Sequence, residues 1–177
     1  MNYSVIRFLI AILLPCLMLI ALIACSVSSD IVEFTIPAMQ VCATKVVDGN
    51  TGTDKNAACA LITEKLTAYN ISVSNLPLII MYEQPMNPAH ATYTIGYAIP
   101  QTLTYRLAAD MITKIPAQAV IGVHYNGPPI GITHAHKKVI AYSKQCTDST
   151  AFNIIEILYP SKRDKVITAD IGSIHYK

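Results

Sequence analysis

Hydrophobic positions follow two different patterns along this chain. An uncharged, mainly apolar run extends from Phe8 to Ser29, preceded by the single basic residue Arg7. Beyond this run, apolar stretches with strand-like or helical spacing alternate with polar loops. The first pattern is typical of a membrane-targeting segment, whereas the second predicts a folded domain of strands and helices.

The second pattern occurs twice. Ile36-Pro37-Ala38 returns as Ile115-Pro116-Ala117 at an offset of 79, and each copy opens an apolar stretch that predicts a strand. The helical positions Ile62, Leu66 and Tyr69 are matched by Ala135, Val139 and Tyr142 at an offset of 73. Two further strands are predicted in each half, because 78–82 matches 155–159 at an offset of 77 and 94–96 matches 170–172 at 76. Each half is therefore predicted to be strand, helix, strand, strand.

Two such units predict an α+β fold. The duplicated βαββ units, about residues 33–100 and 112–177, would form one antiparallel sheet with the helices on one face and a ligand groove on the other. A second helix is expected from Thr133 to Gln145, with Thr133 as its N-cap.

Composition narrows the class of protein. Of the 177 residues, 53% are hydrophobic and 14% are charged, and the net charge is +2. The chain can therefore bury a core and is not intrinsically disordered. The near-neutral balance argues against a nucleic-acid partner, which requires a basic face.

The apolar run ends in Leu22-Ile23-Ala24-Cys25 and there resembles the lipobox of bacterial lipoproteins. The resemblance implies a signal peptide at 1–24, a lipidated anchor and tether at 25–32, and a folded domain at 33–177. Cys25 would carry diacylglycerol, and its amino group would be acylated, as with palmitate. The protein would then be lipid-anchored in the cell envelope, facing the periplasm or the exterior. The alternative is an uncleaved signal anchor, because the uncharged run can span a bilayer.

Three further cysteines follow Cys25, namely Cys42, Cys59 and Cys146. At most one disulfide can form among them, and the sequence leaves open whether it does. We favour small buried side chains for all three.

The duplicated pattern, the Ile-Pro-Ala openings and His124-Tyr125-Asn126-Gly127-Pro128 resemble the GyrI-like small-molecule-binding domain, also called the bacterial transcription activator effector-binding domain. The resemblance spans about residues 33–176. It implies that the sheet groove binds a hydrophobic, often cationic or planar, ligand between aromatic side chains, with a carboxylate supplying charge. Asp170 occupies the place where the family usually has Glu on its final strand.

Candidate ligand-binding residues follow from this resemblance and from strand alternation. Asp170 is the groove acid, and Thr94 is its neutral counterpart in the first half. Glu156 is either a second groove-facing carboxylate or an exposed strand carboxylate near Lys162 or Arg163. The aromatic residues expected nearest the groove are Tyr93, Tyr97 and Tyr125.

The leading hypothesis is a lipid-anchored protein that binds a small hydrophobic or amphipathic ligand. One alternative is a hydrolase of small electrophilic compounds that uses Asp170 with Tyr125 or Tyr93. Another is a haem protein similar to the SOUL family, although none of the histidines stands in a haem motif. His134 and His136 are two residues apart and do not form a zinc pair, so neither a metal site nor a cofactor is expected.

Overall fold

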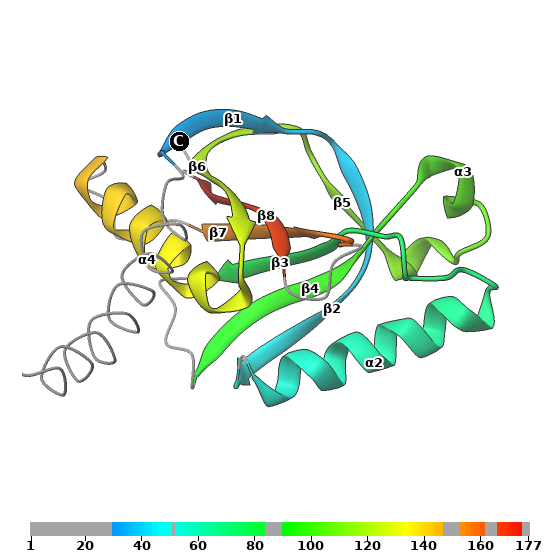
Figure 1. The fold of residues 1–177 in the computed structure, drawn as a ribbon. Helices are drawn as coiled ribbons and strands as arrows, with labels where there is room; N and C mark the ends of the chain where they lie inside the picture. The colour runs from blue at the N-terminus through cyan, green and yellow to red at the C-terminus, as the bar shows by residue number, and fades with distance from the viewer. Residues whose placement is uncertain (1–29, 51, 84–89, 147–152, 162–165, 175–177) are drawn as a thin grey trace, which may run out of the picture.

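The protein is one curled antiparallel sheet with helices against one face (Figure 1). The computed structural model describes residues 30–50, 52–83, 90–146, 153–161 and 166–174. The strands are β1 (Val32–Ile36), β2 (Met39–Gly49), β3 (Leu78–Glu83), β4 (Ala91–Ile99), β5 (Ile112–Ile115), β6 (Gln118–Gly127), β7 (Asn153–Tyr159) and β8 (Ile167–Ile174). The helices are α2 (Thr53–Ala68), α3 (Gln101–Thr104) and α4 (Pro129–Cys146), with a single 3₁₀ turn at Ala109–Met111. The strand order is β1-β6-β8-β7-β3-β4-β2-β5.

The structure confirms the duplicated βαββ arrangement and adds an exchange between the halves. Each predicted opening strand begins just after its proline, as β2 and β6, and a further strand, β1 or β5, ends just before it, because proline cannot donate to the ladder. The pieces before the prolines cross to the other half, so that β1 pairs with β6 and β5 pairs with β2. The two halves also meet at the centre of the sheet, where β3 pairs with β7. The halves therefore share three strand pairings.

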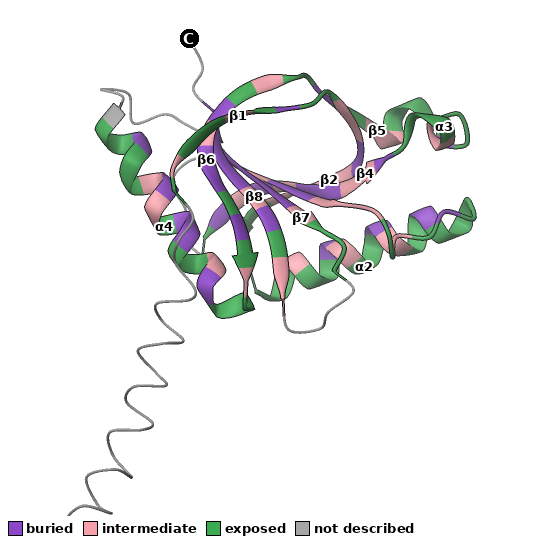
Figure 2. Ribbon diagram, turned by 45° about the horizontal axis from the view of Figure 1, so that its top comes forward, coloured by how far each residue is buried: buried purple, intermediate pink, exposed green. Residues whose placement is uncertain are grey.

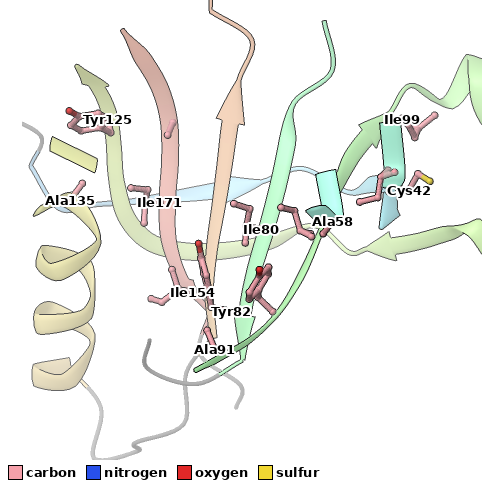
Figure 3. Close-up of a cluster of buried hydrophobic side chains, with 14 of the residues drawn as sticks. Cys42, Ala58, Ile80, Tyr82, Ala91, Ile99, Tyr125, Ala135, Ile154 and Ile171 are labelled. Atoms are coloured by element: carbon pink, nitrogen blue, oxygen red, sulfur yellow. The ribbon is translucent and has the colours of Figure 1, made fainter. Parts of the chain in front are cut away.

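Helices α2 and α4 both pack on the same face of the sheet, where their buried side chains join one mixed aliphatic and aromatic core. Part of this core is shown in Figure 3. The predicted helical positions Ile62, Leu66 and Val139 are at most 1% exposed. Helix α4 begins at Pro129, four residues before the expected start. Proline is favoured at the first helical position, because its missing N–H needs no partner there and its φ already suits the helix.

The sheet curls inward toward its helix-free face (Figure 2). Aliphatic side chains line that face. Eight of them are buried against one another: Ile36, Val41, Ile79, Ile115, Val120, Ile155, Ile157 and Ile174. The backbones of neighbouring strands approach closely on this face. A Cβ on Gly122 would lie 1.9 Å from the carbonyl oxygen of Ile171, and one on Gly96 would lie 2.3 Å from that of Cys42. The aliphatic cluster therefore occupies the middle of the face that the sequence predicts as a groove.

Strand register corrects one step of the predicted repeat. β3 and β4 correspond to β7 and β8 at a single offset of 76, since Leu78 lies opposite Tyr97 and Ile154 lies opposite Ser173. The offset of 77 predicted for β3 and β7 is wrong by one residue. Because side chains alternate between faces, that slip transfers Glu156 to the other face of the sheet. Its true counterpart is Ile80 rather than Ile79.

Several predictions concern residues 1–29, which lie outside the described part of the chain. The signal peptide, the lipobox and Cys25 are among them. Within the described ranges, no helix is long and apolar enough to cross a bilayer. Cys42 is buried and Cys59 partly buried, and both are free thiols. The side chain of Cys146 is not described.

Candidate functional site

Asp170 lies on the helix-free face of the sheet at the centre of a polar cluster. Its Oδ1 is 2.5 Å from Nδ1 of His124, and its Oδ2 accepts a 2.6 Å hydrogen bond from the hydroxyl of Tyr159. These side chains come from the adjacent strands β8, β6 and β7. We call Asp170, His124 and Tyr159 the carboxylate cluster.

Strand pairing explains how the cluster forms. His124 is directly opposite Asp170 in the β6–β8 ladder. Ile157 is opposite Asp170 in the β7–β8 ladder, and Tyr159 follows two residues later on the same face. The ring of Phe34 on β1 contacts His124, with ring centroids 4.6 Å apart and planes tilted by 38°. Four adjacent strands therefore hold the cluster and its aromatic neighbour in place.

The carboxylate cluster is accessible to solvent. The side chain of His124 is 59% exposed, and that of Asp170 is 18% exposed. An ionised carboxylate offers about four acceptor positions, and among the described residues two donors contact Asp170. Asp170 can therefore accept a further hydrogen bond from a donating or cationic ligand.

Tyr159 is held in its protonated form. Burial, the hydrogen bond to Asp170 and the negative charge of that carboxylate together raise the pKa of Tyr159 well above its ordinary value. At neutral pH, the tyrosine is therefore a hydrogen-bond donor that orients the carboxylate.

The corresponding positions in the first half carry different chemistry. Thr94 lies on the same face as Asp170 and is opposite Lys45 in the β2–β4 ladder, as the repeat predicts. Lys45 forms an exposed ion pair with Glu83, at 2.8 Å between Nζ and Oε1. Lys45, Glu83 and Thr94 thus replace His124, Tyr159 and Asp170. Because the backbone forms equally well with either set, the fold itself does not require the carboxylate cluster.

The three tyrosines expected nearest the groove lie on the other face. Tyr93 and Tyr125 are buried beneath the helices, at 0% and 3% exposure, and Tyr97 packs against the same core. Burial raises the pKa of each. Tyr125 donates a 2.5 Å hydrogen bond to the carbonyl of Pro128 before α4. Their placement differs from the expectation, because odd-numbered positions of β4 and β6 face the helices.

Glu156 is neither groove-facing nor exposed. It is 2% exposed beneath the helices, and its Oε2 lies 3.3 Å from both Nε2 of His136 on α4 and the hydroxyl of Tyr82 on β3. Burial raises the pKa of this carboxyl, but the hydrogen bond and charge of His136 outweigh that effect and hold the pKa below its ordinary value. We call Glu156, His136 and Tyr82 the buried network.

Two members of the carboxylate cluster, His124 and Tyr159, were not among the predicted site residues. The sequence carried a signal for both. His124 lies in the segment that resembles the GyrI-like domain, and Tyr159 shares a strand face with Ile155 and Ile157. The hydrolase alternative paired Asp170 with Tyr125 or Tyr93, whereas the tyrosine that contacts Asp170 is Tyr159. Among the described residues, no group of three His, Cys, Asp or Glu side chains could hold a metal ion.

Comparisons with known proteins connect this architecture to solved structures. The EcmrR C-terminal domain matches with a TM-score of 0.59 and 11% identity, over 84% of this chain and 97% of that one. SAV2435 bound to tetraphenylphosphonium matches with a TM-score of 0.48 and 10% identity, over 82% and 94% of the two chains. A hydrolase from Listeria innocua matches with a TM-score of 0.43 and 9% identity, over 81% and 90%.

No protein-family model matches the chain, and no curated protein matches its sequence significantly. The likeness to the EcmrR domain supports the GyrI-like resemblance at the level of the fold.

Proposed function

We propose that this chain is a lipid-anchored protein that binds a small hydrophobic or amphipathic ligand at Asp170. The observation that carries the proposal is the carboxylate cluster itself. Asp170 is held by His124 and Tyr159, yet remains partly exposed and able to accept another hydrogen bond. A cationic or hydrogen-bond-donating ligand fits this acceptor.

One feature of the surroundings supports a ligand with apolar parts. The ring of Phe34, which is only partly buried, lies next to His124 and offers an aromatic surface. Aromatic and apolar walls around a few oriented polar groups are the usual composition of small-molecule sites.

The first testable result concerns Asp170→Asn. With tetraphenylphosphonium as a hydrophobic cation probe, we expect this variant to bind roughly 10- to 100-fold more weakly, because the neutral amide no longer attracts the phosphonium charge. Binding would be measured by calorimetry on the full chain in lipid nanodiscs, with empty nanodiscs as the baseline. The amide retains the shape of the side chain, so thermal unfolding should change little.

Glu83→Gln is the matched control, because it removes the carboxylate of the corresponding polar group in the first half, at the position that corresponds to Tyr159. It should leave probe binding unchanged. If Asp170→Asn lowers the unfolding midpoint and leaves the affinity of the folded protein intact, Asp170 has a structural role and the proposed site is wrong.

The anchoring part of the proposal rests on the apolar run that ends in Leu22-Ile23-Ala24-Cys25. Cleavage before Cys25 and its acylation would hold the domain at a membrane of the cell envelope, facing the periplasm or the exterior. Two or three acyl chains bind a bilayer much more firmly than one, because each buried methylene contributes about 0.8 kcal/mol.

A labelling experiment tests the anchor. Cys25→Ser should abolish incorporation of radiolabelled palmitate in bacterial cells that process lipoproteins, whereas Cys59→Ser should leave it unchanged. Unaltered labelling of Cys25→Ser would contradict the interpretation of 22–25 as a lipobox and would favour an uncleaved signal anchor.

A further inference from the structure

A pocket of about 790 Å³ lies at one end of the sheet, where β2 begins and where β4 and β5 end. Six of its nine lining residues are apolar, and the lining comes from residues 38–40, 99–101 and 114–116. The lining residues are Ala38, Met39, Gln40, Ile99, Pro100, Gln101, Lys114, Ile115 and Pro116. A pocket of this volume is large enough for a small organic molecule.

Three polar side chains converge on the pocket. Gln40 on β2 is opposite Ile99 on β4 and opposite Lys114 on β5. The side chains of Gln40, Ile99 and Lys114 therefore form a row on one face of the sheet. Gln101 follows β4 at the same end. Within the described part of the chain, the side chains of Gln40, Gln101 and Lys114 make no hydrogen bond or ion pair with other side chains. Two amides and one ammonium group are therefore available to a ligand.

The duplicated fold shows that these polar groups are not needed to form the strands. At the repeat offset of 79, Ala119 corresponds to Gln40 and Thr35 corresponds to Lys114. Thr35 and Ala119 pair in the β1–β6 ladder as Lys114 and Gln40 pair in the β5–β2 ladder. The β1–β6 pair thus forms the same backbone pairing as the β5–β2 pair without the cation or the amide.

We propose that this pocket binds a small aliphatic carboxylate. The Lys114 ammonium would form an ion pair with the carboxylate, and the amides of Gln40 and Gln101 would donate hydrogen bonds to it. The alkyl chain would contact Ile99, which lies on the same face as Gln40 and Lys114, and the prolines Pro100 and Pro116 of the pocket lining. This site is separate from Asp170, since β8 and β2 are separated in the sheet by β7, β3 and β4. The two sites also prefer ligands of opposite charge.

Charge reversal at Lys114 tests the proposal. Octanoate, octylammonium and 1-octanol would be titrated separately into the full chain in nanodiscs, again with empty nanodiscs as the baseline. The native protein should bind octanoate more tightly than the other two. Because Lys114 is exposed, the loss of its ion pair with the carboxylate alone would lower the affinity for octanoate by up to about fivefold. Repulsion from the new carboxylate in Lys114→Glu should weaken octanoate binding further, to about tenfold or more overall, and should favour octylammonium.

Lys144→Glu on α4 is the matched control, because it makes the same change in net charge at an exposed lysine outside the pocket lining. It should leave the preference for octanoate over octylammonium unchanged. An equal effect of Lys144→Glu, or equal binding of octanoate and 1-octanol by the native protein, would overturn the proposal. Tetraphenylphosphonium binding should not respond to Lys114→Glu, so this pocket and the Asp170 site can fail independently.

Discussion

Glu156→Ala should lower the free energy of unfolding by about 3–5 kcal/mol, the usual cost of removing one partner of a buried ion pair. The carboxylate is 2% exposed and is the acceptor for both His136 and Tyr82. Its loss leaves His136 buried without its partner, and Nδ1 of the same ring already has none among the described residues. Urea unfolding at pH 7, followed by circular dichroism, measures the change.

The first half of the chain supplies a compensated variant. Ile80 occupies the strand position of Glu156, and Thr63 occupies the helix position of His136. The double variant Glu156→Ile with His136→Thr should therefore recover most of the stability lost in Glu156→Ala, because no buried charge remains unpaired. A single variant that costs less than about 1 kcal/mol, or a double variant as unstable as the single one, would contradict this account of the buried network.

The same network gives stability a defined pH dependence. Because the pKa of Glu156 is lower in the folded protein than in the unfolded chain, its contribution is complete above the unfolded value of about 4.3. The contribution is lost as the pH falls through the lower, folded value, since protonation then removes the charge. The native protein should therefore lose more stability than the double variant between pH 7 and pH 3, as measured by the urea midpoint.

Neither half of the domain should fold alone. A fragment comprising residues 33–105 keeps β2 to β4 and all of β1 except Val32, but removes β6, β5 and β7, which pair with β1, β2 and β3 respectively. The fragment would expose three unpaired strand edges and the aliphatic side chains of the helix-free face. We expect an unfolded or aggregated chain, with no cooperative thermal transition and no dispersion in its amide NMR spectrum.

Co-expression with residues 106–177 is the control for this experiment. The two fragments together contain every strand of the sheet, so they should associate and recover a cooperative transition. A monomeric, cooperatively unfolding 33–105 fragment would show that the strand exchange is not needed for stability.

The sequence by itself determined the repeated strand, helix, strand, strand order, because proline positions and hydrophobic spacing are local signals. It also placed Asp170 and Thr94 at equivalent positions on one face. Only the tertiary structure decided which strands pair, and therefore which side chains meet. An offset of 76 instead of the predicted 77 is a small difference in sequence, yet it moves Glu156 from the helix-free face to the buried network.

The sequence did not predict the exchange of β1 and β5 between the halves either, because Val32 and Gly122 are paired across 90 positions of sequence. The same holds for the contacts of Asp170 with His124, 46 residues away, and of Glu156 with Tyr82, 74 residues away. Local periodicity specifies the face that a side chain occupies within its own strand. Its neighbours on that face depend on long-range register, which is set by the packing of the whole sheet.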